Sequence, residues 1–131
     1  MDQKYILNLD SGRRVAAAAE AEAVKNGWDV AIAIVDDGAH LMYLQREKVQ
    51  LGSIETAIKK ARAALMFRRS TLFWEEMVDE GRPGYLAMPG IMPLEGGIPL
   101  VYQGEVVGAI GISGAKSTDD GIVAQAGAAA L

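Results

Sequence analysis

Glycine is concentrated in one stretch that otherwise alternates like β-strands, PLEGGIPLVYQGEVVGAIGISGA from Pro93 to Ala115, which holds six of the chain's fifteen glycines. Glycine weakens a strand interior, so a strand that keeps it generally has a bulge or lies where another backbone or a ligand comes close. Residues 98–102 and 105–112 predict a hairpin that turns at Gln103-Gly104. We expect this hairpin to pack very closely or to form the wall of a ligand site.

A second hairpin is predicted earlier in the chain, where two apolar runs are joined by Asp37-Gly38, a residue pair that favours tight turns. Its first strand, residues 30–35, is apolar at both odd-numbered and even-numbered positions. We therefore expect it to be covered on both faces. A helix capped by Asp10 or Ser11 precedes this hairpin and is expected to end at Gly27.

The clearest amphipathic helix begins at Ser53. Lys59, Lys60 and Arg62 are expected on its solvated side, and its apolar side carries Ile54, Ala57, Ile58, Ala61 and Leu65. A short helix over residues 70–80 and a last helix from Ser117 follow, with Asp120 completing a capping box.

The long segment between these last two helices begins with RPGYLAMPGIMPLEGG, residues 82–97, which predicts a functional loop because proline and glycine leave little room for regular structure. The element order is αββααββα without repeats or a linker. The sequence therefore predicts one mixed α/β (α+β) domain over residues 1–131, a single antiparallel sheet with helices packed on it.

Composition narrows the classes of function. The net charge of −4 argues against a nucleic-acid surface, which needs a concentrated basic face. Apolar runs are interrupted by charges too often for a membrane span or a signal peptide. The chain has no cysteine, which excludes disulfides and thiolate metal sites and fits a reducing compartment. We therefore expect a cytoplasmic protein without a nucleic-acid or membrane partner.

Four groups are candidates for chemistry. His40, the only histidine, is either an ordinary surface or packed residue, a base, or a ligand to haem iron, which needs one protein ligand where zinc needs three or four. Glu95 is a candidate general base or hydrogen-bond acceptor. Arg62 and Arg69, two helical turns apart, are a candidate carboxylate clamp. Gly96-Gly97 forms either an anion-binding nest or a simple bend into the strand.

Three segments, SIETAIKKARAA, the glycine-rich stretch and TDDGIVAQAGAAAL, resemble the GlcG/HbpS family, also known as domain of unknown function 336 and as the C-terminal domain of PduO-type proteins. The resemblance covers nearly the whole chain. It implies a sandwich with an antiparallel sheet of about five strands, assembly into dimers to octamers, and binding of haem in some members. Haem-binding members use a histidine near the start of the domain, whereas the first histidine here is His40.

The family signature is present at these positions: Lys60, Ala61, Arg62, Gly96, Gly97, Pro99, Gly108, Gly111, Ser113, Gly114 and Asp120. From the resemblance and the candidate groups together, we predict that the ligand-binding residues are Lys60, Arg62, Gly96, Gly97, Pro99 and Ser113.

The sequence favours two functions over a third, a scaffold or subunit-interface protein without a ligand. The first is a homo-oligomeric protein that binds haem or a small carboxylate-bearing metabolite, with His40 as the iron ligand. The second is a cofactor-free lyase, isomerase or hydrolase in the catabolism of small organic acids or aromatic compounds, with Glu95 or His40 transferring the proton.

Overall fold

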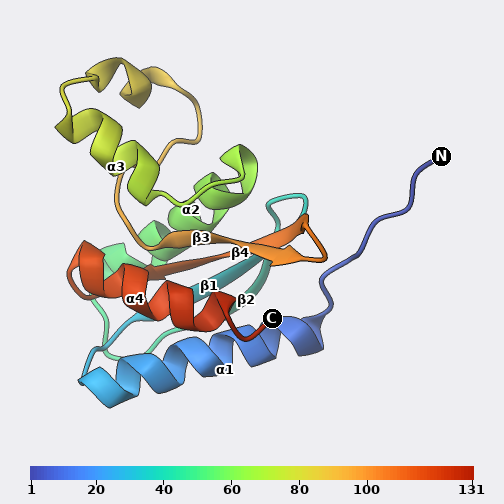
Figure 1. Cartoon of the computed structure of the whole chain (residues 1–131). Helices are drawn as coiled ribbons and strands as arrows, with labels where there is room; N and C mark the ends of the chain where they lie inside the picture. The colour runs from blue at the N-terminus through green and yellow to red at the C-terminus, as the bar shows by residue number, and fades with distance from the viewer.

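A computed structural model describes all 131 residues and contains one sheet with helices on both of its faces (Figure 1). The elements are α1 (Leu9–Asn26), β1 (Ala31–Asp36), β2 (Leu41–Gln45), α2 (Leu51–Phe67), α3 (Leu72–Asp79), the 3-10 helix η1 (Pro83–Ala87), β3 (Gly97–Tyr102), β4 (Glu105–Ser113) and α4 (Ser117–Ala128). The predicted order is confirmed, and η1 adds one short helical turn within the predicted loop.

The sheet has four strands in the order β2-β1-β4-β3, and every neighbouring pair is antiparallel. The expectation of about five strands is wrong by one, because the chain supplies two hairpins and each contributes two strands. The hairpins join through β1 and β4, which leaves β2 and β3 as the edges of the sheet.

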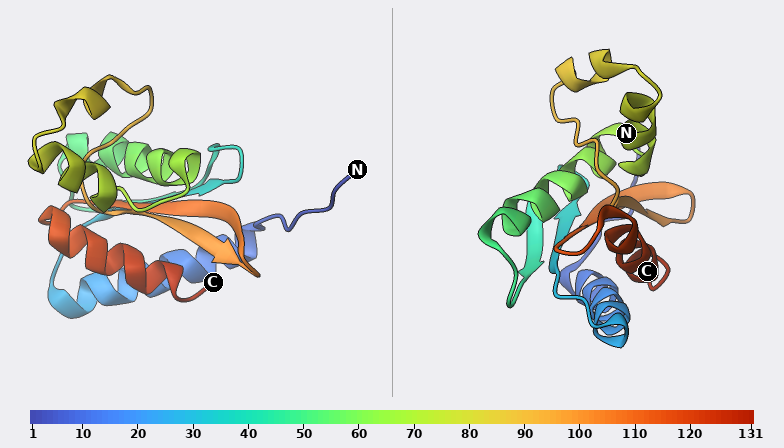
Figure 2. Two further views of the ribbon diagram at one scale, coloured as in Figure 1. Left: turned by 45° about the horizontal axis from the view of Figure 1, so that its top comes forward. Right: turned by 90° about the vertical axis from the view of Figure 1, so that its left-hand side faces the viewer.

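Helices α1 and α4 cover one face of the sheet and α2 covers the other (Figure 2). Ile32 and Ile34 of β1 belong to the core with α1 and α4, whereas Ala31, Ala33 and Val35 belong to the core with α2. The prediction that this strand is covered on both faces is confirmed. No helix is both long and apolar enough to span a membrane.

The glycines of the second hairpin let α2 lie directly on the sheet. A Cβ atom on Gly111 would overlap the carbonyl oxygen of Ala57, and a Cβ atom on Gly97 would overlap the carbonyl oxygen of Lys60. Close approach of another backbone is therefore one reason for the glycine in this hairpin.

The ends of α1 and α2 differ from the predicted ones. Helix α1 begins at Leu9, because the Asn8 side chain, rather than Asp10 or Ser11, accepts the Ser11 N–H at 2.8 Å. Helix α2 begins at Leu51, two residues before Ser53, whose side chain is buried. It ends at Phe67, so Arg69 lies outside the helix.

The capping box predicted for α4 is wrong. The helix begins at Ser117 as expected, but no side chain caps it, and the Asp120 carboxylate turns inward to the Ala115 N–H. Helix α3 and η1 together form an excursion from the main body (Figure 1), anchored by Trp74, which is buried against Phe67.

Candidate ligand-binding site

A buried ion pair connects helices that lie on opposite faces of the sheet. Lys60 of α2 and Asp120 of α4 are each 2% exposed, and Nζ and Oδ2 are 3.0 Å apart. Nζ also donates to the Ile112 carbonyl at 2.9 Å, and Oδ1 accepts the Ala115 N–H at 2.9 Å. The prediction that Lys60 lies on the solvated side of α2 is wrong, because its ammonium group is directed inward to these partners.

Glu95 lies beside this ion pair, just before β3. Its N–H donates to Oε1 of Glu75 at 3.1 Å, and its carboxylate packs against Gly121 of α4 so closely that a Cβ there would overlap it. Burial, and then the charge of Glu75, raise the pKa of Glu95 above its ordinary value, although Lys60 acts in the opposite direction. A carboxyl group with a raised pKa is a candidate for proton transfer.

Gly96 and Gly97 are engaged in the fold around the ion pair. The Gly97 N–H donates to Oγ1 of the buried Thr71 at 2.9 Å, and the Gly97 carbonyl accepts the Thr71 N–H at 3.0 Å. The Gly96 carbonyl accepts the Ile112 N–H at 2.9 Å. The Gly97 N–H is therefore already paired within the chain and is not free to form an anion-binding nest.

Two further predicted residues lie in the sheet itself. Pro99 is in the edge strand β3 opposite Ala109, where a proline can be accommodated. Ser113 is the last residue of β4, opposite Ala31, and is buried. We call the group formed by Lys60, Glu95, Gly96, Gly97, Ser113 and Asp120 the ion-pair end of the molecule.

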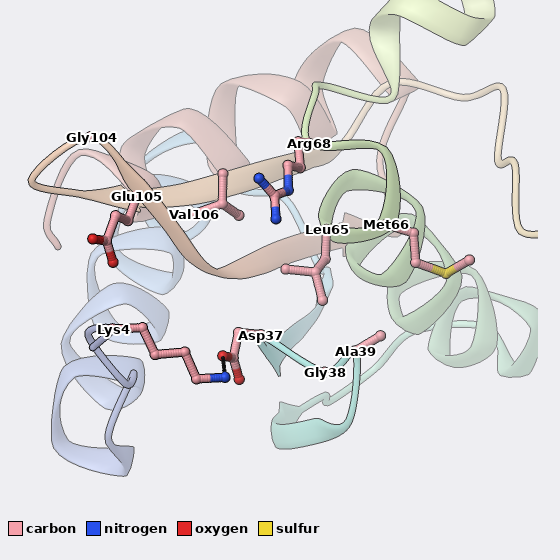
Figure 3. A pocket seen from close by; sticks show the side chains of 10 residues that line it. All are labelled: Lys4, Asp37, Gly38, Ala39, Leu65, Met66, Arg68, Gly104, Glu105 and Val106. Carbon is pink, nitrogen blue, oxygen red and sulfur yellow. Dashed lines mark ion pairs between the residues drawn. The ribbon is translucent and has the colours of Figure 1, made fainter. Parts of the chain in front are cut away.

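A cavity of about 650 Å³ lies elsewhere, beside two hairpin turns (Figure 3). We call it the turn cavity. It is lined by Lys4, the β1–β2 turn at residues 37–39, the end of α2 at residues 65, 66 and 68, and the β3–β4 turn at residues 104–106. Its volume is within the range of about 300–1,000 Å³ that is usual for small-ligand sites.

His40 directly follows the β1–β2 turn that lines the turn cavity, although it is not itself one of the lining residues. Its side chain is 84% exposed, and its ring lies over Gly38, so that a Cβ on this glycine would be 3.0 Å from Nδ1. Nδ1 is 3.5 Å from Oδ1 of Asp36. Nε2 makes no hydrogen bond within the chain and is free to bind a ligand. The chain forms no cluster of three or more His, Cys, Asp or Glu side chains that could hold a metal ion.

Asp36 holds the turn that carries His40. Its Oδ1 atom accepts the N–H groups of Gly38 and His40, each at 2.9 Å. Partial burial acts to raise the pKa of Asp36, but the His40 and Gly38 N–H groups together with the nearby His40 ring keep this pKa below its ordinary value. Arg62 supports the same turn from α2, because its Nε donates to the Ala39 carbonyl at 3.2 Å.

The predicted carboxylate clamp of Arg62 and Arg69 is not assembled. Because α2 ends at Phe67, Arg69 is not on the helix face that carries Arg62. Its guanidinium instead lies over the ring of Phe73, 4.4 Å from the centroid, while Arg62 is used to hold the β1–β2 turn.

The two residues predicted for proton transfer lie at different ends of the sheet. Asp36, which contacts His40, pairs with Gly108, whereas Ala31 pairs with Ser113 near the ion-pair end. The five residue steps from Ala31 to Asp36 span roughly 16 Å of strand. His40 and Glu95 therefore do not form one catalytic site within a single chain.

Sequence reasoning missed three residues of these regions. Asp120 was interpreted as a helix cap, although a buried partner for Lys60 was needed as soon as Lys60 was placed among the apolar positions Ala57, Ala61 and Ala64. Thr71 was not considered, and nothing in its local sequence predicts its bonds to Gly97. Arg68, which lines the turn cavity, is not among the candidates that the sequence suggests.

The fold defines a small α+β sandwich with helices on both faces of one sheet. Residues 7–129 match the family model described as "Haem degrading protein HbpS-like". The chain belongs to this HbpS-like family, as the signature residues in the sequence predicted.

Individual relatives agree with this assignment. The chain is 42% identical over 115 residues to "Protein GlcG" of Escherichia coli strain K12. The alignment covers 86% of this chain and 85% of that protein. It is similar to the crystal structure of HbpS, with a TM-score of 0.89 and 30% identity over 100% of this chain and 94% of the other. It is also similar to the "PduOC:Heme Complex", with a TM-score of 0.86 and 26% identity over 97% and 96% of the two chains.

Proposed function

We propose that this protein binds a small apolar ligand that carries carboxylate groups, with haem as the leading candidate, and that the ligand occupies the turn cavity. The observation that carries the proposal is the free Nε2 of His40, a residue that directly follows the turn residues 37–39 that line this cavity. The solved relative described as a PduOC:heme complex supports haem as the ligand to test first.

The types of residue in and next to the turn cavity are compatible with haem binding. A single imidazole is sufficient as a protein ligand to haem iron, and His40 is available for that role. Leu65, Met66 and Val106 provide apolar surface for the ligand. When bound, haem would supply redox chemistry at its iron, while this chain would hold and orient it. Arg62 would act indirectly by fixing the turn on which His40 is carried.

A haem titration followed by absorbance tests this proposal in the wild type, in His40→Ala and in Glu95→Gln. We expect a saturable Soret shift at one haem per chain, which His40→Ala abolishes. Glu95→Gln is the matched control, because it removes a charge at the ion-pair end and should bind as the wild type does. A shift that is absent, or is equal in the wild type and His40→Ala, would contradict ligation by His40.

A second candidate function is a cofactor-free lyase, isomerase or hydrolase acting on a small organic acid or aromatic compound. The raised pKa of Glu95 favours it, since a carboxyl group that holds its proton nearer neutrality can act as an acid or base. Because His40 lies elsewhere, Glu95 would act without it. Turnover of candidate acids that is unchanged in Glu95→Gln would exclude this mechanism.

We also propose that the protein is a homo-oligomer, between a dimer and an octamer, as the family resemblance implies. Leu41 and Leu44 on the edge strand β2 are 41% and 37% exposed, and Leu51 at the start of α2 is 85% exposed, which leaves apolar surface for contact between copies. Sedimentation of the purified chain tests this, and a monomer at high concentration would contradict it. The cytoplasmic location expected from the sequence stays a prediction.

A further inference from the structure

We propose that Arg68 is the anion-binding residue of the turn cavity and that the ligand is an apolar molecule whose oxyanion group is bound by this guanidinium. This inference rests on the proposed function in that it uses the same cavity. The inference goes beyond the proposed function because it names the residue that recognises the ligand and the chemical class that this residue selects.

Arg68 is the charged group of the cavity that has no partner in the chain. Lys4 is paired with Asp37, with Nζ and Oδ2 2.6 Å apart, and Glu105 accepts the N–H of Tyr5 at 3.4 Å. Arg68 takes part in none of the ion pairs or side-chain hydrogen bonds of the structure. Figure 3 shows its guanidinium extending over the cavity near Val106 and away from the Lys4–Asp37 pair. It is therefore free to bind an anion.

The backbone of Arg68 supports a functional role for its side chain. Arg68 is the residue that ends α2, with φ 53° and ψ 41°, in the left-handed region. Helix α1 ends in the same conformation with Gly27, at φ 73° and ψ 27°. Glycine is the usual residue at this position because a Cβ is strained there. The arginine at this position carries some backbone strain and presents its guanidinium group at the cavity.

The rest of the lining indicates what the anion is attached to. Leu65 and Met66 come from the last turn of α2 and Val106 from β4, and together they give the cavity an apolar side. The negative charge of Asp37 is already matched by Lys4, whereas Glu105 would repel a second anion at the β3–β4 turn. We infer a ligand with an apolar body and an oxyanion at one side of it, since guanidinium pairs well with carboxylate-like groups.

Two fluorescent probes of nearly the same shape test this inference. 8-Anilinonaphthalene-1-sulfonate carries an anion, and N-phenyl-1-naphthylamine lacks it. We expect Arg68→Ala to weaken binding of the anionic probe by about tenfold or more, because a charge-assisted hydrogen bond is lost. Binding of the neutral probe should change less than about twofold. Arg68→Lys should retain part of the affinity, and Arg13→Ala, which removes an exposed charge from α1, should bind both probes as the wild type does.

Arg68→Gly gives a second readout that a purely structural role would not produce. Removing the Cβ from a left-handed position should raise the thermal midpoint of unfolding by roughly 2–4 °C while binding of the anionic probe is lost. Anionic-probe binding that is absent in the wild type, or equal in the wild type and Arg68→Ala, would overturn the inference. Equal losses of both probes in Arg68→Ala would overturn it too, because they would indicate a damaged cavity.

Failure of this inference can be told apart from failure of haem binding. If haem does not bind but the anionic probe binds in an Arg68-dependent way, the inference stands with another ligand of the same class. If haem binds through His40 but neither Arg68→Ala nor Arg68→Lys affects the anionic probe, only the inference about Arg68 is lost.

Discussion

The ion-pair end and the turn cavity use charge in opposite ways. At the ion-pair end, Lys60 and Asp120 are buried and each charged atom is paired within the chain. At the turn cavity, Arg68 is exposed, as is His40 next to the lining turn, and neither the guanidinium nor Nε2 has a partner in the chain. The difference indicates that the signature residues of the ion-pair end hold the sandwich together, whereas the turn cavity keeps groups available for a ligand.

The largest expected effect comes from breaking the buried ion pair. Asp120→Ala would leave the Lys60 ammonium buried without its counter-charge, and we expect a loss of about 3–5 kcal/mol in the free energy of unfolding. The double variant Lys60→Met, Asp120→Leu should recover much of this loss, since it removes both charges. Urea unfolding measures both. Equal losses in the single and double variants would show that the charges are not coupled.

A smaller but still clear effect is expected from the glycine contacts between β4 and α2. Gly111→Ala would place a Cβ against the backbone of Ala57 and Ala61, which forces α2 away from the sheet. We expect a loss of about 1–3 kcal/mol, as in other overpacked cores.

Gly52→Ala is the matched control for this prediction, because Gly52 lies in α2 with nothing within 4 Å of its added Cβ. It should stabilise the protein by about 0.5–1 kcal/mol, since alanine is the better helix residue. If both alanine variants had the same stability, close backbone approach would not explain the glycine at position 111.

The smallest effect concerns pH. The folded-state pKa of Glu95 is raised from 4.5, so the folded protein binds this proton more tightly than the unfolded chain does. The stability that this proton contributes is present below pH 4.5 and is lost as pH rises through the folded-state pKa. Because Glu95 is partly exposed, we expect less than about 1 kcal/mol after solvent screening.

Glu95→Gln should therefore flatten the fall in stability above pH 4.5, as measured by urea unfolding at several pH values. Burial also raises the pKa of Asp120. Part of the loss of stability with rising pH should therefore remain in Glu95→Gln. A wild type whose stability rises over this range, with no difference in Glu95→Gln, would contradict the raised pKa of Glu95.

Much of the fold could be predicted because its signals are local. The apolar run of residues 30–35, the turn pairs Asp37-Gly38 and Gln103-Gly104, and the helical spacing after Ser53 each depend on neighbours in sequence. The strand count was less certain because it came from family resemblance. The helix ends were missed where several good capping residues compete, as with Asn8, Asp10 and Ser11, or where no side chain caps the helix, as at Gln50.

The site was harder to predict because its contacts are long-range. The partner of Lys60 lies 60 residues later, although the position of Lys60 between Ala57 and Ala64 already placed it on the buried side of the helix. The separation of His40 from Glu95 depends on the strand register, which sequence alone did not give. No local signal predicted a left-handed Arg68, since glycine is the residue that usually marks such an end.

The most direct test of the account is to locate the ligand by two-dimensional NMR of the ¹⁵N-labelled protein during a titration with gallium(III) protoporphyrin IX, a diamagnetic analogue of haem. A ligand in the turn cavity should produce amide shifts concentrated in residues 37–40, 65–68 and 104–106. Shifts concentrated instead around Glu95, Gly96, Ser113 and Asp120 would place the ligand at the ion-pair end and contradict it, and a spectrum unchanged at saturating porphyrin would contradict porphyrin binding altogether.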